Sequence, residues 1–217
     1  MAKEAVTRSI NEFKNKLTGG VRPNLFNVQI NFPQKVRNKV GNDLETIGSY
    51  LCRSAALPAS TQGLIEVPFR GRFLKIPGDR TFEPWTATFY NTKDFKLRRA
   101  FELWINIANK TDENIGQTSF GEIGGDESGD KAYFSDLVVQ QKSKDKSTNI
   151  LREYHLIGAW PTNVSAINLA YDSNDQVEEF DVEFQYQYMD AGVPGVGKSQ
   201  NGASSVSFNG ELTKELP

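Results

Sequence analysis

The segment VEEFDVEFQYQYM, at residues 177–189, alternates apolar and polar side chains through most of its length. Its apolar positions are Phe180, Val182, Phe184, Tyr186 and Tyr188. Because successive side chains of a β-strand point to opposite faces, this period of two predicts a strand with one buried and one wet face. Such strands are typical of antiparallel sheets, since parallel sheets are usually buried on both faces. The sequence therefore predicts a mainly β, antiparallel fold.

Similar patterns recur along the chain. Alternation is clear at residues 26–32 and 85–89, and we expect further strands at 48–56, 63–70, 132–141, 150–158 and 164–171. One helix is expected within TKDFKLRRAFELWINIANK, residues 92–110. Its apolar stripe consists of Leu97, Phe101, Trp104, Ile105 and Ala108. This spacing predicts a helix packed on a sheet, and Asp94 lies near its start, where the helix dipole favours an acid.

Composition excludes several classes of function. The chain has 217 residues, long enough for a core without metal or disulfide support. One cysteine, Cys52, and one histidine, His155, leave no Cys or His pair for a zinc site within the chain. The net charge of -2 argues against a basic surface that wraps nucleic-acid phosphates. No apolar run approaches the ~20 residues of a membrane span, so we expect no such span. From the other observations on composition we expect no metal and no cofactor.

Several segments differ from the alternating strands. Residues 1–20 are expected to form an amphipathic segment with apolar side chains at helical spacing, without the apolar core of a signal peptide. Residues 33–47 and 111–130 are polar and Gly-bearing, and we expect loops inserted into a β domain at 21–190. Residues 191–217 are a Gly- and Ser-rich tail. Such a tail either stays flexible or becomes ordered on a neighbouring subunit.

The sequence GVPGVGKS, residues 192–199, matches the phosphate-binding loop pattern G-x-x-x-x-G-K-S. That loop binds phosphates with backbone amides at the start of a helix. Here an alternating strand precedes the match and SQNGASSVSFNG follows it, which does not favour a helix. A nucleotide-binding function is therefore a distant alternative, and we predict no catalytic residue and no enzyme.

Four stretches together resemble the tail tube protein of contractile-tailed bacteriophages. They are RPNLFNVQI (22–30), SAALPAS (54–60), GDRTFEPWTATFYN (78–91) and GAWPTNVSAINLAYDSNDQVEEFDVEF (158–184). This resemblance implies an antiparallel two-sheet sandwich or barrel with one flanking α-helix, a fold shared with type VI secretion and pyocin tubes. It also implies hexameric rings stacked into a hollow conduit for DNA ejection inside a contractile sheath.

The implied partners follow from that role. They are further copies of this chain, the tail sheath protein, the baseplate and tail terminator proteins, and DNA that passes through the lumen without specific binding. The implied location is the virion tail, assembled in the host cytoplasm. A tube of a contractile secretion or pyocin-like system and a baseplate tube-initiator remain open as alternatives.

Two sets of residues are candidates for these roles. The polar face of the 177–189 strand would suit a lumen, because an acidic or neutral wall repels phosphates and keeps friction low. Its candidate lumen-facing residues are Glu179, Asp181, Glu183, Gln185 and Gln187. The segment 54–69 carries more hydrophobic side chains than a monomer usually exposes. It is either an ordinary core strand and turn or a contact between subunits, with Ala55, Leu57 and Pro58 as candidate interface residues.

Overall fold

The computed structural model describes residues 10–17, 20–111, 133–144 and 150–192. The helices are α1 (Ile10–Leu17), α2 (Gln34–Val40), α3 (Leu44–Leu51) and α4 (Lys96–Ala108). The strands are β1 (Phe26–Ile30), β2 (Cys52–Ala55), β3 (Ser60–Phe69), β4 (Arg72–Phe82), β5 (Trp85–Tyr90), β6 (Ser135–Lys142), β7 (Ile150–Val164), β8 (Glu179–Gln185) and β9 (Tyr188–Gly192). The expected insertion at 111–130 lies, except for Thr111, outside these residues, as do most of the expected tail and of the 192–199 motif.

The strands of the body form two antiparallel sheets that share β7. The first half of β7 pairs with β6 and β9, and β6 pairs with β1. The second half of β7 pairs with β8, which continues through β5 to β2. The chain changes sheet near Gly158, whose φ of 62° is readily adopted only by glycine. This confirms a mainly β fold of two antiparallel sheets, but the strands do not close into a barrel.

The core lies between these sheets and α4. Of the apolar stripe expected for α4, Leu97, Phe101 and Trp104 are almost completely buried and are joined by Ala100. Ile105 and Ala108, also expected in the stripe, are only half-buried, so the stripe is confirmed in part. The rings of Phe101 and Phe89 are 5.4 Å apart, and those of Trp104 and Phe184 are 6.2 Å apart. Asp94 accepts a hydrogen bond from the Lys96 amide, which gives the helix start the acid that the sequence predicted.

The predicted flanking helix is α4, but two further helices, α2 and α3, were not predicted. Most of residues 33–47, expected to be a polar loop, form α2 and the start of α3, which bury Val36 and Leu44. The strand expected at 48–56 is the second half of α3 followed by the short β2. The strand expected at 164–171 is absent, since β7 ends at Val164 and the chain then enters a loop.

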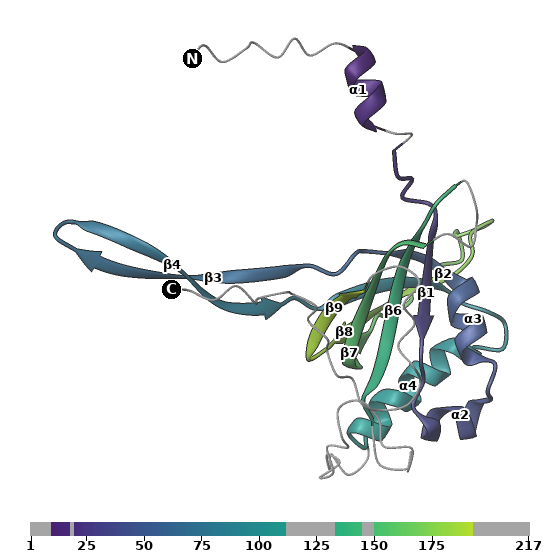
Figure 1. Ribbon diagram of the computed structural model, residues 1–217. Helices are drawn as coiled ribbons and strands as arrows, with labels where there is room; N and C mark the ends of the chain where they lie inside the picture. Colours follow the sequence, from purple (N-terminus) through teal and green to yellow (C-terminus); the bar gives the residue numbers. More distant parts are fainter. Residues whose placement is uncertain (1–9, 18–19, 112–132, 145–149, 193–217) are drawn as a thin grey trace.

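Two elements stand away from the body (Figure 1). The helix α1, whose helical form was predicted, buries none of its residues, and its Ile10, Phe13 and Leu17 are exposed. The strands β3 and β4 form a two-stranded hairpin, here called the arm (residues 60–82), which projects from the side of the body opposite α2 and α3. At ~3.3 Å per residue its strands of 10 and 11 residues reach ~30 Å. The arm and the outer surfaces of the body are therefore the candidate functional regions.

Candidate interaction site

The arm exposes an unusual amount of apolar surface. All residues of β3 are exposed, and β4 is exposed except at the half-buried Gly78 and Phe82. Phe69 and Phe73, next to the turn, expose 67% and 62% of their surface. A two-stranded hairpin without a packed face is marginally stable in water, and exposed apolar patches usually mark interaction sites. The arm therefore has the character of a binding element.

The pairing of β3 with β4 places five apolar side chains on one face, whereas Leu64 and Phe73 lie on the other. Ile65 lies opposite Ile76, and Val67 lies opposite Leu74. Directly paired residues of an antiparallel ladder share a face, and Phe69 is two positions beyond Val67 on the same strand. On the other face Glu66 lies opposite Lys75, with 3.6 Å between the carboxylate oxygen and the ammonium nitrogen. The arm thus has an apolar face (Ile65, Val67, Phe69, Leu74, Ile76) that no other described part of the chain covers.

Sequence reasoning found only half of this element. It predicted a strand at 63–70 but not β4. The missed signal is the turn at Arg70 and Gly71, both with positive φ, at 45° and 79°. A two-residue turn with glycine in second place, between two alternating runs, is typical of a tight β-hairpin.

The three predicted interface residues lie where the arm leaves the body. Ala55 ends β2 and is half-buried, Leu57 is exposed, and Pro58 is half-buried. Two hydrogen bonds attach residues 55–59, here called the root of the arm, to the body. The Trp85 indole donates a hydrogen bond of 2.7 Å to the carbonyl oxygen of Ala56, and the Tyr186 hydroxyl donates one of 3.4 Å to that of Ala59. Burial raises the pKa of Tyr186.

Four of the five predicted lumen-facing residues share the outer face of β8. Glu179, Asp181, Glu183 and Gln185 alternate with the core residues of that strand. Gln187 does not belong to this strand, because it lies in the break between β8 and β9, where its backbone N–H donates to the Ile157 carbonyl oxygen. Apolar and polar side chains continue to alternate through Tyr188. From Tyr188 onward, however, the chain forms β9, which pairs with the first half of β7.

The acids of β8 differ in their partners. Glu179 forms an ion pair with Arg53 of β2. Asp181 is exposed and accepts a hydrogen bond of 2.7 Å from the Thr88 hydroxyl. Glu183 lies opposite Thr86 of β5, and no ion pair of Glu183 occurs within the described residues. Among the residues that the structure describes, Asp181 and Glu183 on the outer face of β5 and β8 therefore have no ion-pair partner.

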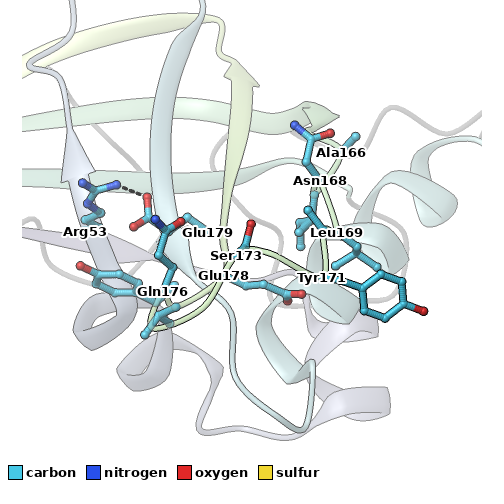
Figure 2. A pocket seen from close by; sticks show the side chains of 13 residues that line it. Arg53, Ala166, Asn168, Leu169, Tyr171, Ser173, Gln176, Glu178 and Glu179 are labelled. Atoms are coloured by element: carbon cyan, nitrogen blue, oxygen red, sulfur yellow. Dashed lines mark hydrogen bonds and ion pairs between the residues drawn. The ribbon is translucent and has the colours of Figure 1, made fainter.

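The loop between β7 and β8, residues 165–178, borders an open groove of about 1110 Å³ (Figure 2). Arg53 and Glu179 lie at one end of the groove, and Leu169 and Tyr171 come from the other side. Leu169, Tyr171 and Val177 are all strongly exposed. This surface was not predicted, since residues 164–171 were expected to be a strand.

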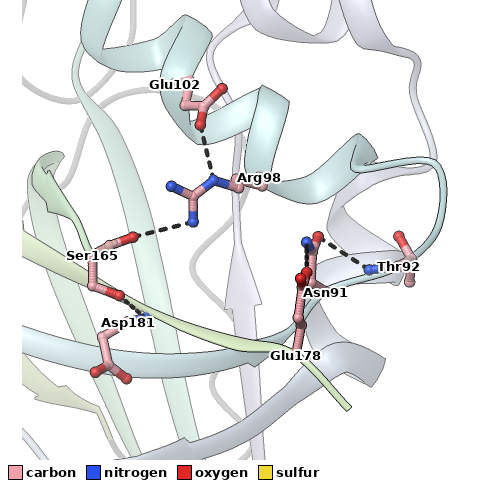
Figure 3. A network of polar contacts seen from close by, with 7 residues as sticks. All are labelled: Asn91, Thr92, Arg98, Glu102, Ser165, Glu178 and Asp181. Atoms are coloured by element: carbon pink, nitrogen blue, oxygen red, sulfur yellow. Dashed lines mark hydrogen bonds and ion pairs between the residues drawn. The ribbon is translucent and has the colours of Figure 1, made fainter. Parts of the chain in front are cut away.

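Polar contacts fix both ends of that loop to the body (Figure 3). At the first end the Arg98 guanidinium donates to the Ser165 carbonyl oxygen at 3.1 Å and also contacts Glu102. At the second end the Asn91 side-chain amide donates to the Glu178 carboxylate at 2.8 Å. The loop is therefore held in place at its ends and presents its middle to the outside.

Cys52 is half-buried at the start of β2, and burial raises the pKa of its thiol to about 12. Because the thiolate is the reactive form, the folded protein should react slowly with Ellman's reagent at pH 8. We expect the rate to rise at least tenfold when urea unfolds the chain. The native state also keeps its proton above pH 9, so this group's contribution to stability should fall as the pH rises from about 9 toward 12. Equal rates of reaction with Ellman's reagent in the presence and absence of urea would contradict a buried, protonated thiol at Cys52.

Comparison with known proteins agrees with this architecture. The phage tail tube protein family model matches residues 21–190. The tail tube protein gp19 of Enterobacteria phage T4 is 33% identical over 167 residues, which cover 77% of this chain and 89% of that protein. The tail tube protein of Serratia phage KSP90 is 28% identical over 181 residues, which cover 82% of this chain and 94% of that protein.

Among solved structures, the tube-terminating cap of the anti-feeding prophage is similar in fold. It has a TM-score of 0.54 at 14% identity, and the match covers 88% of this chain and 95% of that one. The resemblance seen in the sequence is thus confirmed by a family match over most of the chain and by relatives from contractile-tailed phages. This chain therefore belongs to the phage tail tube protein family.

Proposed function

We propose that this chain is the repeating subunit of a phage tail tube, in which hexameric rings stack into a hollow conduit for DNA ejection. Family membership makes the chain a structural component of the virion tail and not an enzyme. The observation that carries the proposal is the arm, whose apolar face has no partner among the described residues of its own chain. A second copy can cover that face, and a repeated contact of this kind closes into a ring or extends into a filament.

The proposed partners follow from the same role. In the extended tail the tube would lie inside the sheath, start at the baseplate and end at the terminator. We propose assembly in the host cytoplasm, and no helix within the described residues is long and apolar enough to cross a membrane. The T4 relative, named a tail tube protein, is 33% identical, whereas the anti-feeding prophage cap is 14% identical and shows the fold alone. A tube subunit is therefore better supported than a cap or an initiator.

Electron microscopy of the purified full-length chain tests this proposal. We expect stacked rings of uniform diameter with a central channel, formed without any other protein. A chain that stays monomeric over a wide range of concentrations and salt, or that forms only irregular aggregates, would contradict it.

We further propose that the outer face of β5 and β8 lines the channel. Asp181 and Glu183 lie there beside Thr88 and Thr86, so the wall would be acidic and hydroxyl-bearing. Such a wall repels DNA phosphates, whereas lysines would hold them by releasing counterions.

Replacing both acids, as Asp181→Lys and Glu183→Lys, should leave tubes intact and slow genome ejection several-fold at low salt. Time-resolved DNA release from phage that carry the variant measures this. Glu179 is kept unchanged because it pairs with Arg53, and Asp181→Asn with Glu183→Gln is the matched control without added positive charge. Ejection at the wild-type rate from intact Lys-variant tubes would contradict a channel-facing position.

A further inference from the structure

The tip of the arm and the loop between β7 and β8 carry opposite charge. The tip, residues 68–74, contains Arg70 and Arg72 and no acid. The loop, residues 165–178, contains Asp172, Asp175 and Glu178 and no Lys or Arg. Most of these charged side chains have no ion-pair partner within the described residues. Within the described residues no ion pair occurs at either arginine or at Asp172 and Asp175, whereas Glu178 is engaged by Asn91.

Both surfaces also expose large apolar side chains next to their charges. At the tip Phe69 and Phe73 flank the two arginines, and the Arg70 guanidinium lies 5.4 Å from the centre of the Phe69 ring. On the loop Leu169, Tyr171 and Val177 are strongly exposed and border the open groove (Figure 2). A contact between the two surfaces would bury aromatic and arginine side chains, the types enriched at the centre of interfaces.

The fold places these surfaces at opposite ends of one sheet. The strand β5 begins at Trp85, which contacts the root of the arm, and ends at Tyr90, which borders the groove. Six strand residues span ~17 Å between these ends, and the arm carries its tip ~30 Å further out. Figure 1 shows the arm leaving the body on the side opposite α2 and α3. The tip and the loop of one chain are therefore too far apart to meet.

We propose that the arm tip of one copy docks on the 165–178 loop of the next, with Arg70 and Arg72 facing Asp172 and Asp175. This inference rests on the proposed function and adds the surface that receives the arm. The two sides of the contact differ, so it is heterologous and repeats from copy to copy. Because both ends of the loop are fixed to the body by Arg98 and Asn91, the receiving surface is in place before docking.

Charge exchange tests the proposal. One variant carries Arg70→Glu and Arg72→Glu, and a second carries Asp172→Lys and Asp175→Lys. Each replaces attraction by repulsion at the same contact, so each alone should raise the protein concentration needed for assembly about tenfold or more at low salt. An equimolar mixture of the two should assemble near the wild-type concentration, because the arm of each fits the loop of the other. One chain with all four substitutions should assemble likewise.

Sedimentation of polymers over a concentration series gives the readout, and circular dichroism confirms that these exposed substitutions leave the fold intact. Normal assembly of either charge variant alone would overturn the proposal, as would failure of both the mixture and the fourfold variant to recover. These failures leave the tube proposal standing, provided that the wild-type chain polymerises. A wild-type chain that forms no polymer overturns both.

Discussion

Replacing Phe101 by alanine is expected to lower the free energy of unfolding by ~3–5 kcal/mol, the usual cost of removing a large aromatic side chain from a core. Phe101 is fully buried on α4, and its ring lies 5.3 Å from Phe32, 5.4 Å from Phe89 and 5.8 Å from Phe184. It thus joins the helix to β5 and β8 and to the segment after β1. Most domains have a stability of ~5–15 kcal/mol, so this change removes a large part of it.

Urea unfolding followed by tryptophan fluorescence measures the loss, at protein concentrations below those that support assembly. Phe73→Ala on the arm is the matched control, since Phe73 is 62% exposed and should change the stability of the monomer very little. A cost below 1 kcal/mol for Phe101→Ala would contradict the position of α4 in the core.

Introducing an ion pair on the apolar face of the arm is expected to prevent assembly. Val67 and Leu74 lie directly opposite each other on that face. The double variant Val67→Glu and Leu74→Lys copies the Glu66–Lys75 pair of the other face, so the two strands should still pair. Burying a Val or Leu side chain contributes ~1.5–3 kcal/mol. Losing both contacts should raise the concentration needed for assembly by about two orders of magnitude or more.

Sedimentation velocity distinguishes the outcomes, with a monomer expected for the variant and polymers for the wild type. The control exchanges the charges of the opposite face, as Glu66→Lys and Lys75→Glu, and should assemble normally. If both variants assemble alike, the apolar face is not a contact between copies.

The parts of the fold that the sequence predicted are those in which burial repeats with a clear period. The strand β8 and the helix α4 bury side chains at every second position and along one stripe, respectively, so their patterns report their surroundings directly. The stretch SYLCRSAAL, at 49–57, is short and apolar, and periodicity cannot separate a helix from a strand in such a run. There the second half of α3 was mistaken for strand.

Other features could not be predicted because they depend on which strand or surface lies beside a segment. The pattern of apolar and polar residues in the segment itself does not report that. The alternation of β8 continues past Gln185 although the chain changes sheet, because alternation reports which side is buried and not which strand lies beside it. The arm is the clearest case. Its apolar residues suggest a core strand, yet they are exposed. The pattern of residues 63–70 fits a core strand and a contact between subunits equally, so the sequence could not decide between these two interpretations.

A cryo-electron microscopy reconstruction of polymers formed by the full-length chain tests the central claim most directly. We expect a hollow tube of stacked rings in which the apolar face of each arm is buried on a neighbouring copy and the outer face of β5 and β8 borders the channel. Polymers whose arms point into solvent, or a chain that forms no polymer, would contradict this account.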